Sequence, residues 1–145
     1  MIRELCKKDL TEDYLKLLTQ LSGTFDENKN YYMPIVRFWT WYEGQNVSYK
    51  IFVYENKGVV EGTATVFIEK KLLHGGSSVG HIEDVVVNNK KRLKGVGKAL
   101  IGRCVEYAKQ QNCYKVILDC ADHNIPFYES CGFTRTDNCM RIDLE

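Results

Sequence analysis

The strongest chemical signal in the sequence is a glycine-containing segment at residues 88–98, which also carries five basic side chains. Glycine lets the backbone approach a ligand closely, and the unpaired N–H groups in the first turn of a helix favour a negative charge. If a helix begins near Gly95, the segment predicts a cradle for a phosphate or pyrophosphate group. A tight turn with a solvated basic surface is the alternative that this segment alone leaves open.

Carboxylates and a tyrosine that could transfer protons surround this segment. Glu83 and Asp84 precede it, and Asp119 and Tyr128 follow it. Adjacent residues of a strand point to opposite faces, so Glu83 and Asp84 do not form a paired acid and base unless a bulge re-aims one of them. A buried carboxylate at the end of an apolar strand needs a partner. We therefore expect Asp119 to bind a substrate group or, alternatively, to cap the turn that follows it.

The elements that must position these residues are strands and helices in an order typical of an α+β protein. Apolar periodicity and turn residues predict strands at residues 2–5, 49–55, 59–70, 79–88, 115–120 and 133–144, and helices at residues 10–21, 31–42, 95–111 and 125–130. The strands on either side of residues 56–58 should form an antiparallel hairpin, and a βαβ crossover follows in the C-terminal half. We expect an α+β fold with a mixed, mostly antiparallel sheet flanked by helices.

Length and composition restrict the class of protein. The 145 residues, 44% of them hydrophobic, suit a single domain over residues 1–145. A net charge of +1 argues against a protein whose main role is to bind nucleic acid or an anionic membrane. No stretch approaches the roughly 20 apolar residues of a membrane span, and the N-terminus lacks the apolar core of a signal peptide. We therefore expect a cytoplasmic protein.

The cysteines predict neither a metal site nor a redox pair, because they lack CxxC spacing and paired histidine ligands. We expect reduced thiols and no metal. The six are Cys6, Cys104, Cys113, Cys120, Cys131 and Cys139.

A dinucleotide site of the Rossmann type is the rival interpretation of Gly95 and Gly97, since Asp119 lies roughly where a ribose-binding acid would stand. It fails because the third motif position is Leu100, where glycine or alanine is needed. The connection before the glycines is also long and basic, and antiparallel strands precede this unit where parallel repeats would be expected.

The motifs instead resemble those of the GNAT acetyltransferase superfamily and, within it, the glucosamine-6-phosphate N-acetyltransferases. Arg92, Gly95 and Gly97 match the superfamily's pyrophosphate-binding pattern. Further motifs of the narrower family are matched at residues 80–84, 113–115, 118–120 and 127–133, and the similarity runs nearly without gaps over residues 69–140. The resemblance implies a GNAT fold and transfer of acetyl from acetyl-coenzyme A to the 2-amino group of D-glucosamine 6-phosphate, which would feed UDP-N-acetylglucosamine synthesis.

The resemblance also implies direct attack of the amine, without a covalent enzyme intermediate, and roles for individual residues. Tyr128 matches the tyrosine that hydrogen-bonds the coenzyme A sulfur, and a phenol with an ordinary pKa near ~10 is protonated at neutral pH and able to donate to a thiolate. Catalytic roles are implied for Tyr128, Asp119 and Glu83. Cofactor contacts are implied for Val85, Val86, Val87, Arg92, Leu93, Lys94, Gly95, Val96, Gly97, Lys98, Asn124 and Tyr128. Substrate contacts are implied for Thr19, Lys71, His74, Glu83, Asp84, Asp119 and Arg141. His81 is interpreted as a structural, hydrogen-bonding histidine.

One position departs from the family pattern. The family usually places a phosphate-binding arginine, often reaching across a dimer interface, three residues after the methionine that matches Met140, and here Asp143 stands there. Arg141 would face the same side of a strand and is a candidate substitute. The resemblance implies a homodimer. Two alternatives stay open: a GNAT enzyme acting on another amine, such as a polyamine or a peptide, and a non-catalytic acetyl-coenzyme A binding module.

Overall fold

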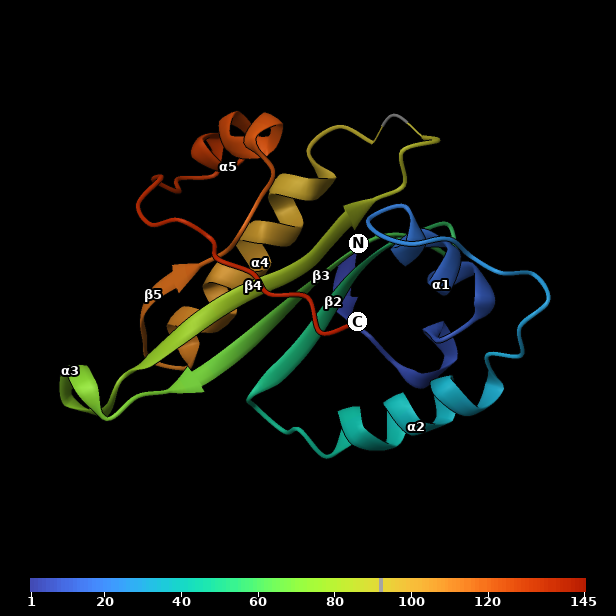
Figure 1. Cartoon of the computed structure of the whole chain (residues 1–145), viewed down its shortest axis with the longest axis horizontal. Coiled ribbons are helices and arrows are strands. Elements are labelled where there is room, and N and C mark those ends of the chain that lie inside the picture. Colours follow the sequence, from blue (N-terminus) through green and yellow to red (C-terminus); the bar gives the residue numbers. More distant parts are fainter. Residues whose placement is uncertain (92) are drawn as a thin grey trace.

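The computed structural model describes residues 1–91 and 93–145, and its central feature is a twisted five-stranded sheet (Figure 1). The strands are β1 (Ile2–Glu4), β2 (Tyr49–Asn56), β3 (Val59–Lys70), β4 (Ser78–Val87) and β5 (Cys113–Ile117). They lie side by side in the order β1-β2-β3-β4-β5, with antiparallel pairing except between β4 and β5, which are parallel. The expected α+β fold with a mixed, mostly antiparallel sheet is confirmed.

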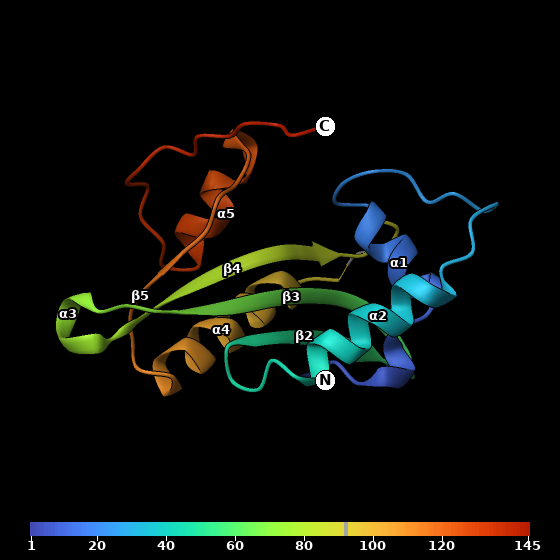
Figure 2. The ribbon, with the colours of Figure 1, turned by 60° about the horizontal axis from the view of Figure 1, so that its bottom comes forward.

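Helices cover both faces of the sheet. They are α1 (Glu12–Thr19), α2 (Tyr32–Glu43), α4 (Val96–Gln110) and α5 (Ile125–Ser130), with short 3-10 turns η1 (Lys7–Asp9) and η2 (Asp122–Asn124). The four-residue element α3 (Leu73–Gly76) closes the β3–β4 hairpin and is a tight turn, because His74 and Gly75 have left-handed backbone angles inside it. Figure 2 shows α3 at one end of the long β3–β4 ribbon and α1 near the other end.

The helix α4 forms the larger hydrophobic core with one face of the sheet. Its buried residues recur at the three- and four-residue spacing of a helix face, and the main ones, Leu100, Ile101 and Cys104, cluster with Phe52 and Val66 of the sheet. The other face of the sheet packs on α1 and α2 in a second cluster: Leu5, Tyr14, Tyr42, Ile51 and Val53. Because neighbouring residues of β2 alternate between these two clusters, the sheet is buried on both sides along β2.

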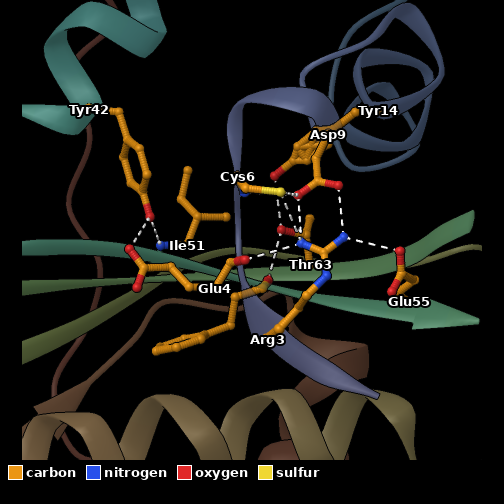
Figure 3. Close-up of polar contacts among 10 residues, drawn as sticks. Arg3, Glu4, Cys6, Asp9, Tyr14, Tyr42, Ile51, Glu55 and Thr63 are labelled. Carbon is orange, nitrogen blue, oxygen red and sulfur yellow. Dashed lines mark hydrogen bonds and ion pairs between the residues drawn. The ribbon is translucent and has the colours of Figure 1, made fainter. Parts of the chain in front are cut away.

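Polar contacts attach the N-terminal elements to the sheet (Figure 3). Arg3 donates to both carboxylate oxygens of Asp9, at 2.7 and 2.8 Å, and to Glu55 at 3.2 Å. The hydrogen bond from Arg3 is the main reason that the pKa of Asp9 is lowered to about 2. On the face of the sheet that packs on α1 and α2, the hydroxyls of Tyr14 and Thr63 lie 2.9 Å apart and are hydrogen-bonded. These contacts hold β1 and α1 against the strands that lead to the candidate site.

Two predictions about the C-terminal third are wrong. Residues 133–145 form no helix or strand, although a last strand was predicted at residues 133–144. The apolar side chains of that segment, Met140, Ile142 and Leu144, are 90, 83 and 91% exposed, so they have no apolar surface to cover within this chain. The strand predicted at 115–120 spans Cys113–Ile117 instead, because its pairing with β4 stops at Ile117. Asp119 therefore lies beyond the strand and is exposed.

Candidate active site

The candidate site lies where β4 and β5 cease to pair. Their parallel pairing runs from Ser78 and Cys113 to His81 and Ile117, and β4 continues for six more residues, 82–87, paired with β3 but not with β5. Within this stretch the register between β3 and β4 shifts, and Asp84 has a φ of 51°, a left-handed conformation. This irregularity is a bulge. Without one, the neighbouring side chains of Glu83 and Asp84 would point to opposite faces of the sheet. Beyond it, β4 is free on the side that β5 occupies earlier.

A cavity of about 330 Å³ occupies this region. It brings together residues from β4, from the turn before α4 and from the segment around α5 (Figure 1). The lining residues are Val85, Val87, Leu93, Gly95, Gly97, Lys98, Asn124, Phe127 and Tyr128. Segments up to 43 residues apart in the sequence, from Val85 to Tyr128, thus meet around one volume that opens to solvent.

The glycine turn begins α4 as the sequence predicts. Gly95 is the N-cap residue of α4 with a φ of 78°, a conformation that other residues adopt only at a cost. The N–H groups of the first helical turn have no acceptor within the helix, so this end of α4 is suited to an anion. Lys98 adds a positive charge to the cavity wall. The geometry is that of an anion cradle.

Not every expected cofactor residue turns toward this cavity. Val96 is 6% exposed and packs in the α4 core, and Val86 is 8% exposed. Neither side chain lines the cavity, and neither does that of Lys94, which is exposed. Arg92 lies outside the described residues. Any contact of Val86 or Val96 with a ligand would have to use main-chain atoms.

Tyr128 and Asn124, from the segment around α5, line the same cavity as the glycine turn. Burial raises the pKa of Tyr128, and the neighbouring thiols of Cys120 and Cys131 raise it further. The phenol is therefore protonated at neutral pH and is available as a proton donor.

Phe127 is a cavity residue that the sequence analysis did not single out. A Cβ placed on Gly97 would lie 3.1 Å from Cζ of Phe127, so the ring of Phe127 rests directly against the glycine. The sequence feature that could have predicted this role is that Phe127 directly precedes Tyr128 in α5.

Three carboxylates gather at the bulge. Glu83 is exposed as a residue, but partial burial of its carboxyl group raises its pKa, the negative charges of Asp84 and Asp119 raise it further, and His81 opposes the rise. A carboxylate with a raised pKa is a better proton acceptor than an ordinary one. Asp119 belongs to this group, but the reasoning that it is buried is wrong because it lies in the exposed loop after β5.

His81 has the structural role that was expected. Its Nε2 lies 2.9 Å from Oε1 of Glu69, on the neighbouring strand β3. His81 lies in the part of β4 that precedes the bulge at Asp84.

The expected phosphate-binding residues do not reach the cavity within one chain. Lys71 pairs with Glu69 at 3.1 Å, and the His74 ring stacks on Tyr114 with 3.9 Å between centroids. Both lie at the α3 end of β4, and the five residue-to-residue steps from Ser78 to Glu83 already span about 17 Å of strand. Arg141 is exposed and pairs with Asp143 at 3.0 Å. Thr19, at the end of α1, donates its hydroxyl to the carbonyl of Lys16 at 2.7 Å.

Within residues 1–91 and 93–145, no cluster of three or more histidine, cysteine, aspartate or glutamate residues is placed to hold a metal ion. All six cysteines are free thiols. The described helices include none with the length and apolar character needed to cross a membrane.

Comparison with known proteins gives consistent results. Residues 9–133 match the profile of the Acetyltransferase (GNAT) family. The glucosamine 6-phosphate N-acetyltransferase of Trypanosoma brucei brucei is 45% identical over 95 residues, which are 66% of this chain and 65% of the relative. The Candida albicans enzyme of the same name is 33% identical over 131 residues, 90% of this chain and 87% of the relative.

A solved structure is also similar over the whole chain. The crystal structure of glucosamine-6-phosphate N-acetyltransferase from Arabidopsis thaliana superposes with a TM-score of 0.91 at 33% identity. The superposition covers 100% of this chain and 98% of the Arabidopsis chain.

Proposed function

The chain belongs to the acetyltransferase (GNAT) family, and we propose that it transfers acetyl from acetyl-coenzyme A to the 2-amino group of D-glucosamine 6-phosphate. The observation that carries the proposal is the cavity in which the glycine turn of α4 faces Tyr128. The choice of acceptor is supported by the names of the relatives. A cytoplasmic role in supplying N-acetylglucosamine 6-phosphate for UDP-N-acetylglucosamine synthesis is part of the same proposal.

The lining residues offer suitable groups for each part of acetyl-coenzyme A: the pyrophosphate, the pantetheine arm and the sulfur. The first turn of α4, with Gly95 and Gly97, would hold the pyrophosphate, because its N–H groups are donors without helical partners. The free stretch of β4 after the bulge would offer main-chain groups to the pantetheine arm. Tyr128 stands at the remaining end, where it would donate a hydrogen bond to the sulfur.

The protein groups would divide the proton transfers between them. An amine arrives as an ammonium ion and must lose a proton before its nitrogen attacks the thioester carbon. Glu83 is the acceptor that we favour, because its pKa is raised by burial and by two neighbouring carboxylates. Asp84 and Asp119 would orient the cationic amine. Tyr128 would give its proton to the departing thiolate as the C–S bond breaks, so that coenzyme A leaves as the thiol, and the second proton lost by the new amide nitrogen would restore the phenol through solvent.

The phosphate of the substrate requires cations, and the three expected ones, Lys71, His74 and Arg141, do not reach the cavity within one chain. We therefore include a homodimer in the proposal, with Lys71, His74 and Arg141 as candidate phosphate contacts. Three observations support it. The outer edge of β5 lacks a neighbouring strand among the described residues. A groove of about 1030 Å³ lies between β5 and the segment that ends at Cys139. The apolar residues Met140 and Ile142 beyond that groove are exposed.

A second acceptor class is favoured by one observation. Glu83, Asp84 and Asp119 make the acceptor side of a single chain acidic, and an acidic surface suits a polyamine or another cationic amine. A monomeric enzyme with this surface would not distinguish a phosphosugar from other amines by charge attraction.

The deciding experiment measures free-thiol release from acetyl-coenzyme A with glucosamine 6-phosphate, glucosamine and spermidine as parallel acceptors. We expect release with glucosamine 6-phosphate to exceed release with glucosamine by about 100-fold, the value of a paired phosphate contact of roughly 3 kcal/mol. Faster release with spermidine would replace the proposed acceptor by a polyamine. Release with none of the three, while acetyl-coenzyme A still binds, would leave a binding module.

A further inference from the structure

A buried carboxylate outside the cavity has no role in the proposed chemistry. Glu61 of β3 is 2% exposed, and its side chain accepts hydrogen bonds from Nδ2 of Asn88, at 2.8 Å, and from Nζ of Lys91. The carbonyl oxygen of Glu61 also accepts the N–H of Asn88 at 2.8 Å. Burial by itself would raise the pKa of Glu61, but the bonds from Lys91 and Asn88 outweigh it and hold that pKa below its ordinary value. Glu61 is thus ionised.

Gln20, the C-cap residue of α1, extends this arrangement from a different element. Its Nε2 donates to Oδ1 of Asn88 at 3.2 Å, and its Oε1 accepts the N–H of Asn89 at 2.9 Å. Oδ1 of Asn88 accepts in addition the N–H of Lys90 at 3.0 Å. Residues 88–91 are therefore attached both to β3 and to the end of α1.

The attached segment joins the two walls of the cavity. It follows Val87, which lines the cavity from β4, and it precedes the turn in which Leu93 and Gly95 line it from the other side. A cradle of backbone N–H groups stabilises a pyrophosphate only if it stands in the right place relative to the rest of the ligand. The placement of residues 88–91 therefore sets the placement of the cradle.

Charge alone does not account for Glu61. A carboxylate near an anion-binding turn repels the anion, and a buried carboxylate is unfavourable unless it is paired. It also neutralises Lys91, which would otherwise be a free cation four residues before Gly95. The Glu61–Lys91 pair therefore weakens the attraction of this segment for an anion, but it fixes the position of residues 88–91.

We propose that Glu61 is a positioning residue for the cofactor, and that Lys91 serves as its anchor in the loop instead of as a phosphate ligand. Asn88 and Gln20 hold the same loop through their hydrogen bonds to Glu61, to each other and to the N–H of Asn89. This inference rests on the proposed function, because the ligand that the loop receives is the pyrophosphate of coenzyme A.

The substitution Glu61→Gln separates positioning from charge, because the two predict opposite signs. Glutamine keeps the size of the side chain and its hydrogen bond from Asn88, but it releases Lys91 as an unpaired cation. If only charge mattered, the anionic coenzyme A would bind more tightly. If Glu61 positions the loop, we expect the Kd for coenzyme A to rise about tenfold, since one charge-assisted hydrogen bond is lost.

Two lysine variants give a matched control. Lys91→Met and Lys90→Met each remove one positive charge from the same exposed segment, but only Lys91 contacts Glu61. We expect Lys91→Met to raise the Kd about tenfold. Lys90→Met should raise it by no more than about threefold, the usual range for an exposed charge. Lys91→Arg keeps a cationic donor and should recover most of the affinity.

The readouts are coenzyme A titration by calorimetry, the kinetics with acetyl-coenzyme A, and the Tm of each variant. We expect a raised KM for acetyl-coenzyme A with kcat at saturation within about twofold of wild type. If Glu61→Gln fails to fold, Gln20→Ala tests the same arrangement from a half-exposed site, with an expected Kd increase of about fivefold for the loss of its two neutral hydrogen bonds.

Unchanged or tighter coenzyme A binding by Glu61→Gln, or equal effects of Lys91→Met and Lys90→Met, would overturn the positioning role. A wild-type protein that does not bind coenzyme A would instead refute the proposed function itself.

Discussion

Replacing Gly97 by alanine adds one methyl group where α4 begins beside the cavity. The new Cβ would lie 3.1 Å from Cζ of Phe127 and 3.7 Å from Cγ2 of Val87, and ordinary contacts of this kind are 3.4–4 Å. The Phe127 ring must therefore move by a few tenths of an ångström. Such overpacking costs about 1–3 kcal/mol, and the better helix propensity of alanine offsets up to about 1 kcal/mol. The folded state should lose between nothing and about 3 kcal/mol.

The substitution should also weaken cofactor binding, because Gly97, Phe127 and Val87 all line the cavity. We expect the Kd for coenzyme A to rise at least about tenfold, equivalent to about 1.4 kcal/mol. Titration calorimetry measures the Kd, and urea unfolding measures the stability of the same preparation.

Gly102→Ala is the matched control, since it lies in the same helix and an added Cβ there meets no atom within 4 Å. It should gain about 1 kcal/mol of stability without changing the Kd. Phe127→Ala provides a second check, because removal of the ring should reduce the penalty of the Gly97→Ala change. If Gly97→Ala binds coenzyme A as tightly as Gly102→Ala does, the contact with Phe127 does not shape the cofactor site.

Other predictions concern proton transfer, acid stability and assembly. Tyr128→Phe should lower kcat about 100-fold with little change in the Kd for coenzyme A, and an unchanged kcat in steady-state assays would remove Tyr128 from the donor role. As a base with a raised pKa, Glu83 should make kcat/KM increase with pH up to that pKa and level off above it. Glu83→Gln should abolish this limb of the pH profile, and its persistence would point to another acceptor. The pKa of Asp9 is lowered from 3.8 to about 2, so its pairing with Arg3 stabilises the fold above pH 3.8 and this contribution disappears as the pH falls toward 2. Asp9→Asn should therefore cost about 2 kcal/mol in urea unfolding at pH 7 and almost nothing at pH 2, and an equal loss at both would exclude the ion pair as the cause. Ile142→Glu should weaken the proposed homodimer, and sedimentation that gives the same mass as wild type would exclude the C-terminal segment from the interface.

Local sequence determined most of the elements in this chain. Thr11 accepts a hydrogen bond from the N–H of Tyr14 and begins α1, and Pro126 stands in the first turn of α5, which has the predicted bounds. Gly95 begins α4 because only glycine takes its left-handed conformation without a penalty. Helix caps, tight turns and hairpins depend on contacts within a few residues, so a pattern along the chain is enough to predict them.

The tertiary structure decided where the strands end and which charged groups meet. The strand pattern at residues 118–120 continues, but β5 ends at Ile117 because β4 bulges at Asp84 and offers no further partner. The pattern at 133–144 is that of a strand, yet no neighbour among residues 1–91 and 93–145 pairs with it, and β-structure requires a partner. Lys91 resembles its exposed neighbour Lys90 in sequence, and only the approach of Glu61, 30 residues earlier, makes it an ion pair. Pairing and burial depend on residues distant in sequence, and their meeting is a property of the folded chain.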